Sequence, residues 1–260
     1  MTQTERARLL TALHVKGDPL ILFNVWDAGS AHAVADAGAK AIATGSWSVA
    51  AAHGCGDGEE LPLDLAIANA KRIVAAVELP VTIDFEGGYG ESSEAISANV
   101  TQLIETGAVG CNFEDQIVGG EGIYCTDHQC ARIAAMRRAA EQTGVPFFIN
   151  ARTDIFIQAG EAAHEDKHLE DAVRRATAYA KAGANGFFAP CLTRPAQIRK
   201  LCDLSPLPVN IMVLPEAPPS RELAALGVAR ISYGPIPYRE MIASLKMAAQ
   251  QALQPNAGRT

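Results

Sequence analysis

The feature that most constrains the fold is a regular alternation of short apolar runs with segments of helical pattern. Apolar runs recur at residues 20–27, 41–46, 81–86, 109–115, 147–153, 186–190, 209–213 and 230–234. Each is apolar through most of its length, as is typical of a parallel strand buried on both faces. The chain is therefore expected to contain a largely parallel sheet covered by helices.

The segments between these runs have helical periodicity. Apolar residues recur at a spacing of three to four over 63–77, 92–107, 126–144 and 168–183. A glycine separates a helix from the following strand in DAGAK, ETGAV and KAGAN, and shorter or terminal helices are predicted at RPAQIRKLC, SRELAALG and YREMIASLKMAAQQAL.

Eight strands alternating with helices in about 250 residues is the pattern of a (β/α)8 TIM-type barrel of the α/β class. A doubly wound open sheet usually uses fewer strands at this length, and no GxGxxG segment follows the first run. We predict one barrel domain over residues 1–260, with a C-terminal helix at about 237–252 that packs on its own barrel or on a neighbouring subunit.

Charge and cysteine usage exclude several classes of protein. The formal net charge is -7 and no block of Lys and Arg occurs, which argues against nucleic acid or a membrane surface as a partner. No apolar run approaches the roughly 20 residues of a membrane span, and the polar N-terminus is typical of an amphipathic helix rather than a signal peptide. The six cysteines form no CxxC pair or zinc-type spacing, so a reducing cytoplasmic location is expected.

Polar residues gather where the predicted strands end. In barrels of this type the active site lies at the C-terminal ends of the strands. The residues at or near these ends are Trp26, Asp27, Gly45, Ser46, Trp47, Asp84, Glu86, Glu114, Asp115, Asn150, Arg152, Asp154 and Asn210. They are therefore expected to lie at one rim of the barrel.

Three of these residues predict a metal site. Asp84 and Glu86 alternate on the predicted strand 81–86, so they would share one face, and Glu114 ends the neighbouring strand. Three converging carboxylates repel one another unless a cation lies between them, and oxygen ligands suit Mg²⁺ or Mn²⁺. Arg152 adds a planar fork for a carboxylate or phosphonate, so a small polyanionic acid is the expected substrate. Asp115 and Asp154 are interpreted equally well as bracing or capping residues.

Five segments, taken in order, resemble the isocitrate lyase/phosphoenolpyruvate mutase superfamily over nearly the full length of the chain. The matching segments are NVWDAGSAHAVADAGAKAIATGS, GCGDGE, TIDFEGGYG, GCNFEDQ and INARTD. The resemblance implies a (β/α)8 barrel that binds Mg²⁺ and acts on small 2-oxo or 2-hydroxy acids. Such enzymes make or break a bond beside a pyruvyl unit through an enolpyruvate-like intermediate.

The resemblance also assigns roles to residues by position. The metal-site acids of the family fall on Asp84, Glu86 and Glu114, although the family usually has Asp where Glu86 stands. The acid that lies over the reacting centre falls on Asp57, and the substrate-binding arginine falls on Arg152.

Further substrate contacts are implied at other strand ends. The segment Gly45-Ser46-Trp47 corresponds to the loop whose N–H groups hold the pyruvyl carboxylate and oxyanion. Asn210 falls where the methylisocitrate lyases have a substrate-binding asparagine, and Trp26, at the end of the first strand, completes the predicted substrate site.

The chain departs from the family's lyases in the loop after the fourth strand. The segment EDQIVGGEGIYCTDHQC lacks the Lys-Lys/Arg-Cys-Gly-His motif, Gln116 replaces a frequent lysine, and residues 189–191 read APC where methylisocitrate lyases have a Glu. These departures argue against a tricarboxylate substrate. Cys125 and Tyr124 on this loop remain alternative acids.

The leading functional prediction is a Mg²⁺-dependent lyase that cleaves a carbon–carbon bond or decarboxylates a small 2-oxo or 2-hydroxy acid. One alternative is a phosphonopyruvate mutase or hydrolase, which breaks or rearranges a P–C bond. Another is a non-catalytic 2-oxo acid binding protein. The resemblance also implies a homo-oligomer, a dimer or a tetramer with exchanged C-terminal helices.

Overall fold

Eight parallel strands form one sheet that curves into a nearly closed barrel. The computed structural model describes residues 1–254, apart from the side chains of Glu161 and His164. The strands are β1 (Leu20–Leu22), β2 (Ile42–Ala43), β3 (Val81–Asp84), β4 (Gly110–Glu114), β5 (Phe148–Arg152), β6 (Gly186–Phe188), β7 (Val209–Met212) and β8 (Arg230–Ser232). Their order is β1-β8-β7-β6-β5-β4-β3-β2, and a parallel bridge between Val25 and Thr44 brings the two edges together. The predicted (β/α)8 barrel is confirmed.

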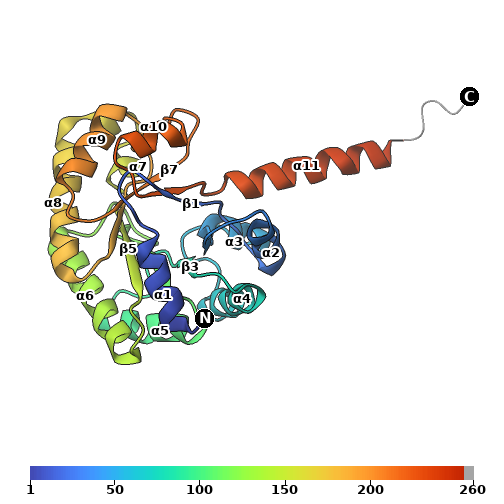
Figure 1. The fold of residues 1–260 in the computed structure, drawn as a ribbon, viewed down its shortest axis with the longest axis horizontal. Coiled ribbons are helices and arrows are strands. Elements are labelled where there is room, and N and C mark those ends of the chain that lie inside the picture. Colours follow the sequence, from blue (N-terminus) through green and yellow to red (C-terminus); the bar gives the residue numbers. More distant parts are fainter. Residues whose placement is uncertain (255–260) are drawn as a thin grey trace, which may run out of the picture.

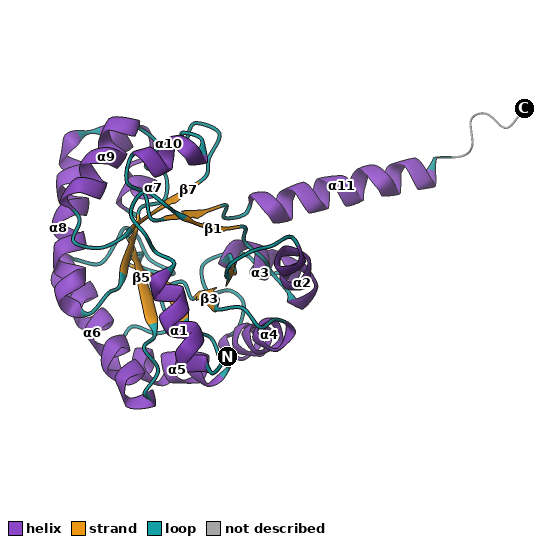
Figure 2. Cartoon of the chain, viewed as in Figure 1, coloured by secondary structure: helices purple, strands orange, loops and turns teal. Residues whose placement is uncertain are grey.

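Helices surround the strands (Figures 1 and 2). They are α1 (Gln3–Ala12), α2 (Ala28–Asp36), α3 (Ser46–Ala52), α4 (Leu63–Ala76), α5 (Ser93–Glu105), α6 (Thr126–Thr143), α7 (Ile155–Ala159), α8 (Asp166–Ala182), α9 (Pro195–Leu204), α10 (Ser220–Ala225) and α11 (Ile236–Leu253), with a 3₁₀ helix at Gly160–His164. The main helices match the predicted segments to within a few residues. At Gly107, between α5 and β4, φ is +94° and a Cβ would lie 2.8 Å from Val74, so glycine suits this tight connection.

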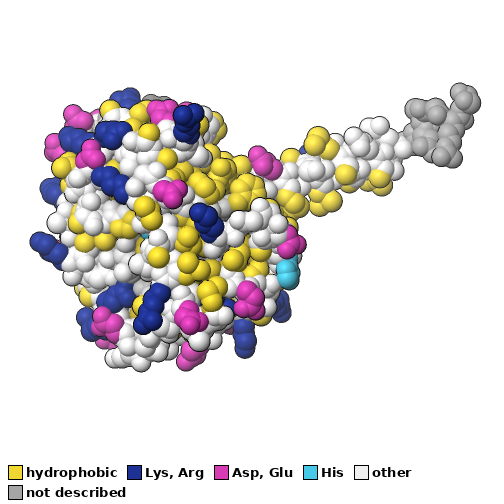
Figure 3. Space-filling view, in the orientation of Figure 1, with side chains coloured by type: hydrophobic (Ala, Val, Ile, Leu, Met, Phe, Trp, Pro, Cys, Tyr) yellow, Lys and Arg dark blue, Asp and Glu magenta, His cyan; other side chains and the backbone are white. Residues whose placement is uncertain are grey.

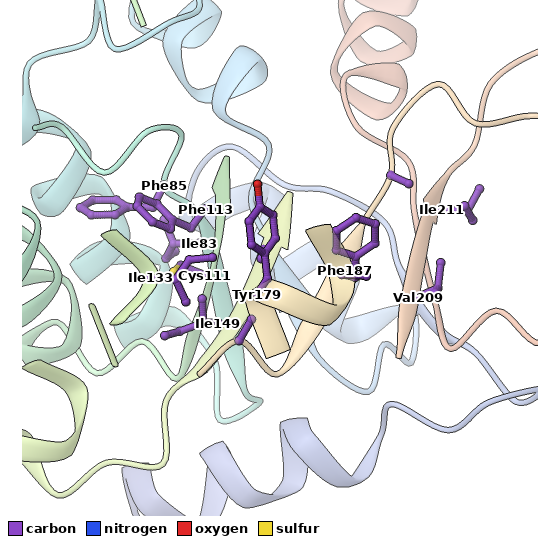
Figure 4. Close-up of a cluster of buried hydrophobic side chains, with 14 of the residues drawn as sticks. Ile83, Phe85, Cys111, Phe113, Ile133, Ile149, Tyr179, Phe187, Val209 and Ile211 are labelled. Atoms are coloured by element: carbon purple, nitrogen blue, oxygen red, sulfur yellow. The ribbon is translucent and has the colours of Figure 1, made fainter. Parts of the chain in front are cut away.

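The main hydrophobic core lies between the strands and the surrounding helices. Ile83, Cys111, Ile149 and Phe187 lie on β3, β4, β5 and β6, one on each strand, and belong to one buried cluster together with residues of the helices (Figure 4). Because alternate residues of a strand point to opposite faces, the intervening residues point into the barrel. A smaller cluster joins Leu10 of α1 to strand residues such as Phe148.

The inward-facing positions carry polar side chains. Asn112, Asn150, Asn210 and Arg230 lie on β4, β5, β7 and β8, and each is at most 5% exposed. Asn150 donates hydrogen bonds to Asn112 (2.9 Å) and Asn210 (3.1 Å), and Arg230 donates to Asn112 (3.0 Å). A hydrogen-bonded polar layer therefore fills the barrel interior.

The predicted strand 81–86 is longer than the observed one, which corrects the basis of the metal-site prediction. β3 ends at Asp84, and Glu86 has a φ of +47° in the turn that follows. Glu86 therefore reaches the rim through a left-handed turn rather than through strand alternation. The turn is held by a hydrogen bond from the Gly88 N–H to the Phe85 carbonyl (2.8 Å).

Helix α11 extends away from the barrel (Figure 1). Beside β1 and α2 the barrel surface carries an apolar groove of about 570 Å³, lined by residues that include Ile21, Phe23 and Val34. Figure 3 shows hydrophobic side chains along α11 and on the barrel surface near its base. Residues 255–260, which end the predicted domain, lie outside the described residues. Within the described chain, no helix combines the length and the apolar character that crossing a membrane would need.

Candidate active site

A cleft with two adjoining lobes lies where the strands end. The first, here called the acid lobe, measures about 120 Å³ and is lined by Ser46, Asp57, Gly58, Glu86, Glu114, Gln116 and Arg152. The second, the barrel lobe, measures about 160 Å³ and is lined by Asn24, Gly45, Ser46, Trp47, Asp57, Asp84, Asn112, Arg152, Phe188, Met212, Ser232, Gly234 and Pro235. Ser46, Asp57 and Arg152 border both lobes, so the two form one site.

Asp84, at the end of β3, is fixed from two sides. Its Oδ2 accepts a hydrogen bond from the Ser46 N–H (2.9 Å), and its Oδ1 accepts one from the Asn112 amide (3.1 Å). Since Asn112 is itself bound by Asn150 and Arg230 through its oxygen, its amide nitrogen must face Asp84. The polar layer of the barrel interior thus orients this carboxylate.

Glu86 is buried beside Asp84 and beneath the loop that carries Asp57. Its carboxylate accepts hydrogen bonds from the Glu59 N–H (2.6 Å) and, at 3.4 Å, from the Tyr89 hydroxyl. Burial raises the pKa of Glu86 to about 7, and the nearby charges of Asp57 and Asp84 act in the same direction.

Glu114 and Asp154 hold Arg152 between them. Nη1 of Arg152 lies 2.7 Å from Glu114, while Nε and Nη2 donate to the two oxygens of Asp154 at 2.6 and 2.9 Å. Burial raises the pKa of Glu114 well above its usual range, although Arg152 opposes this shift. The pair of parallel N–H groups of Arg152 that was expected to bind a substrate acid therefore binds Asp154 instead. Two of the five N–H groups of Arg152 remain for a ligand.

Asp57 lies on the loop between α3 and α4 and faces both lobes. The Ser46 hydroxyl donates to it at 3.3 Å. Burial and the charge of Asp84 raise the pKa of Asp57, whereas Arg152 lowers it. A carboxyl group with a raised pKa that borders a cleft is suited to proton transfer.

The acids of the cleft suit a Mg²⁺ ion that has few direct carboxylate ligands. Among the described residues, no three His, Cys, Asp or Glu side chains converge closely enough to coordinate one ion together. Mg²⁺, however, is usually bound by one or two carboxylates, with water and substrate completing the octahedron. Asp84 is the best-placed direct ligand because it borders the barrel lobe, and Glu86 and Glu114 line the adjoining acid lobe.

The other predicted substrate residues divide into two groups. Gly45, Ser46 and Trp47 line the barrel lobe. Asn210 is fully buried in the polar layer and donates to Ser232 (3.2 Å), and it does not line either lobe. Trp26 packs edge-on against Tyr238 at the base of α11 and likewise lies outside the lining.

Asp115 and Asp154 brace the site from behind. Asp115 is fully buried and accepts hydrogen bonds from the Asp154 N–H (2.9 Å), Arg175 (3.1 Å) and the Tyr179 hydroxyl (2.7 Å). These contacts tie α8 to the ends of β4 and β5. Asp154 in turn holds Arg152, so both acids support the cleft.

Arg132 on α6 is a supporting residue that sequence reasoning missed. It is 3% exposed and donates to the carbonyl groups of Gly87 and Gly90, in the turn that carries Glu86. It also donates to Gln129 (2.6 Å), which binds the Glu114 carbonyl (3.0 Å). The sequence signal was weak because charged residues usually occupy the exposed face of a helix.

Comparison with known proteins finds a matching family model and related proteins. A family model described as phosphoenolpyruvate phosphomutase matches residues 10–253. An uncharacterized protein of Mycobacterium tuberculosis is 34% identical over 87% of this chain and 81% of its own. The 2-methylisocitrate lyase of Escherichia coli is 30% identical over 75% of this chain and 65% of its own.

Solved structures share the architecture. A provisionally assigned phosphonomutase from Burkholderia cenocepacia is 49% identical, with a TM-score of 0.94 over 96% of this chain and 99% of that one. The structure of a phosphonopyruvate hydrolase with oxalate and Mg²⁺ is 21% identical, with a TM-score of 0.82 over 99% of this chain and 93% of that one. At that identity the second likeness concerns the fold alone.

The raised pKa of Glu86 predicts how the stability of the metal-free protein depends on pH. The folded protein binds the Glu86 proton more tightly than the unfolded chain does. The free energy of unfolding should therefore fall as the pH rises from about 4.5 to about 7. The contribution of Glu86 is roughly 3 kcal/mol. Urea unfolding in EDTA at pH 5 and pH 7.5 should therefore show a smaller difference for Glu86→Gln than for the wild type. Equal differences would contradict the environment assigned to Glu86.

Proposed function

Since the chain belongs to the phosphoenolpyruvate phosphomutase family, within the isocitrate lyase/phosphoenolpyruvate mutase superfamily, we propose that it is a Mg²⁺-dependent lyase. It would cleave a carbon–carbon bond of a small 2-oxo or 2-hydroxy acid, or decarboxylate it. The observation that carries the proposal is that Asp57, Asp84, Glu86, Glu114 and Arg152 all border one cleft at the C-terminal ends of the strands.

In this proposal Asp84 would bind the metal directly, and Glu86 and Glu114, which line the adjoining lobe, would hold it through its water ligands. When bound, Mg²⁺, or Mn²⁺ in its place, acts as a Lewis acid toward the substrate's carboxylate and C2 oxygen. Asp84 is already oriented for this by Ser46 and Asn112. The acid unit of the substrate would therefore lie at the boundary between the two lobes.

The protein's own groups complete the chemistry. Asp57, or a water that it holds, transfers the proton at the reacting carbon. The two N–H groups of Arg152 that Glu114 and Asp154 leave free contact a substrate oxygen. Since the Ser46 N–H already binds Asp84, Trp47 is the better-placed backbone donor for charge on the C2 oxygen.

Two alternatives remain distinguishable by assay. A phosphonopyruvate mutase or hydrolase would act on a P–C bond, and the provisional name of the Burkholderia relative motivates testing it. A non-catalytic binder would bind 2-oxo acids without turnover. A panel of 2-oxo acids, malate-type 2-hydroxy acids and phosphonopyruvate, assayed with Mg²⁺, separates all three.

We also propose that the protein assembles by exchanging α11 between subunits. In a (β/α)8 barrel the helix after the last strand packs beside the first helix of the ring. Here α11 projects outward (Figure 1). An apolar groove lies open beside β1 and α2. Ile242, Leu245 and Leu253 recur on one side of α11 and are 40%, 61% and 83% exposed. Reciprocal insertion of α11 into the groove of a second copy gives a two-fold dimer, or a tetramer of two such pairs.

The metal proposal predicts that Asp84→Ala and Asp84→Asn lose Mg²⁺-dependent binding of oxalate. Asparagine keeps an acceptor for the Ser46 N–H but lacks the charge, so it tests the charge itself. We expect the affinity to fall by more than about 100-fold, beyond the effect of a supporting residue, as measured by isothermal titration calorimetry. Asp64→Ala, at an exposed position on α4, is the control. Wild-type affinity in the Asp84→Asn protein would remove Asp84 from the metal site.

The assignment of proton transfer to Asp57 predicts that Asp57→Asn lowers kcat by about 10²–10⁴-fold. Cys125 is exposed at the start of α6, so Cys125→Ser should leave kcat within about twofold of the wild type. Steady-state kinetics on a substrate found in the panel provide the measurement. The reverse pattern, with Cys125→Ser strongly impaired and Asp57→Asn nearly normal, would transfer the role to the loop cysteine.

Helix exchange predicts that Leu245→Asp converts the oligomer to a monomer, because a charge would enter the apolar groove. Gln251→Glu adds the same charge on the opposite side of α11 and should leave the assembly intact. Sedimentation velocity measures both. Leu245→Asp protein that sediments with the wild type would argue against α11 as the connecting element.

A further inference from the structure

Asp57 lies on a loop that is attached to the barrel at both of its ends. This loop, residues 53–62 between α3 and α4, is here called the Asp57 loop. At one end the Cys55 N–H donates to the last turn of α3 (2.9 Å), and at the other end Leu61 is 2% exposed in a small hydrophobic cluster. Although its carboxyl group faces the cleft, Asp57 as a whole residue is exposed, and its hydrogen bond from Ser46 is long at 3.3 Å. The Ser46 contact is therefore too weak to fix Asp57 by itself.

Glu59 attaches the middle of the Asp57 loop to the turn that follows β3. Its N–H donates to the Glu86 carboxylate (2.6 Å), and its own carboxylate accepts a hydrogen bond from the Tyr89 N–H (2.8 Å). A Cβ added at Gly87 would lie only 3.0 Å from Glu59 Oε1, so the carboxylate lies directly against the turn. The two hydrogen bonds run in opposite directions between the same two segments. We call this pair, which joins Glu59 to Glu86 and Tyr89, the Glu59 clasp.

The three residues of the Glu59 clasp share an uncommon backbone conformation. Glu59, Glu86 and Tyr89 have φ values of +62°, +47° and +57°, and the other non-glycine residue with a positive φ in the described part of the chain is Cys191. Residues with a side chain rarely adopt this left-handed region, and they keep it where the surrounding contacts impose it. The contacts of the clasp therefore hold a backbone that these residue types do not favour.

The turn to which Glu59 binds is itself held by two helices. Arg132 of α6 donates to two of its carbonyl groups. Asn99 of α5 donates to the carbonyl groups of Gly88 (3.1 Å) and Tyr89 (2.7 Å) from the other side chain that binds this turn. The clasp therefore ties the exposed loop to a turn that is fixed by the surrounding helices.

From these contacts we propose that Glu59 is a positioning residue that holds Asp57 at the cleft. The inference rests on the proposed function, because Asp57 is taken to transfer the proton at the reacting carbon. Asp57 precedes Glu59 by two residues, which span at most about 7 Å of chain, so fixing residue 59 limits where Asp57 can lie. Glu86 then has two parts, since it lines the acid lobe and also receives the clasp.

The physical reason is the freedom that the loop would gain without the clasp. Gly58, which joins Asp57 to Glu59, has a φ of +86° and can adopt many other conformations. Once residue 59 is released, Asp57 would occupy its place at the cleft for a smaller fraction of the time. The rate of proton transfer falls with that fraction, and a displacement of about 1 Å can cost about 10²-fold.

Glu59→Gly and Glu59→Gln test the proposal as a pair. Glycine removes the carboxylate and also relieves the left-handed strain at residue 59, so this variant should remain folded. Glutamine keeps an acceptor for the Tyr89 N–H. We expect kcat to fall by at least about tenfold in Glu59→Gly and to stay within about threefold of the wild type in Glu59→Gln. The control Glu78→Gly, whose side chain is 91% exposed before β3, should leave kcat unchanged.

Hydrogen exchange gives a readout that does not depend on activity. Mass spectrometry of peptides covering residues 53–62 should show exchange at least about tenfold faster in Glu59→Gly than in the wild type, and wild-type exchange in Glu59→Gln. Wild-type exchange of this loop in Glu59→Gly would overturn the inference. A loss of kcat in Glu59→Gln as large as that in Glu59→Gly would also overturn it, because the hydrogen bond to Tyr89 would then not be the cause.

The double variant Asp57→Asn/Glu59→Gly separates a positioning role from a general structural one. If Glu59 acts through Asp57, the kcat of the double variant should lie within about twofold of that of Asp57→Asn alone. Losses that multiply would overturn the inference and leave the role of Asp57 intact. If Asp57→Asn alone keeps nearly the wild-type kcat, the proposed function of Asp57 fails, and the inference fails with it.

Discussion

The cleft depends on a hydrogen-bonded polar layer inside the barrel. Arg230 is 1% exposed, and burial lowers its pKa to about 10, so it stays protonated at neutral pH. It donates to Asn112, whose amide donates to Asp84 at the rim. A buried cation with no carboxylate in contact is costly, and the field of Asp84 is among the influences that favour its charge. The same arrangement fixes the orientation of Asp84, so the stability of the interior and the geometry of the proposed metal site are linked.

A second set of contacts holds the acids from outside the barrel. Arg132 and Gln129 on α6 bind carbonyl groups of the turn after Glu86 and of Glu114 itself. Helix packing therefore sets the relative positions of two acid-bearing segments that belong to different strands. Arg132 also stacks on Tyr124, near the end of the loop between β4 and α6.

The two sides of the cleft carry different side chains. Asp84 and Glu114, at the ends of β3 and β4, are carboxylates expected for metal-assisted bond cleavage, and the ends of β6 and β7 supply the apolar Phe188 and Met212. A barrel permits this division because each strand end contributes its own residues to the rim. Tyr238 of α11 packs near both Trp26 and Trp47, and Trp47 lines the barrel lobe, so the helix proposed to join subunits begins beside the cleft.

The sequence by itself determined the barrel, the helices around it and the grouping of Asp84, Glu114 and Arg152 at one rim. Periodicity and strand order suffice for this, because the C-terminal ends of parallel strands must meet. It did not determine what each side chain binds there. That Asp154 occupies the fork of Arg152, that Asn210 belongs to the interior layer and that Phe188 faces the cleft follow from contacts between segments far apart in the chain. Only the tertiary structure decides such contacts, because hydrogen-bond partners and burial depend on distances that local sequence patterns do not contain.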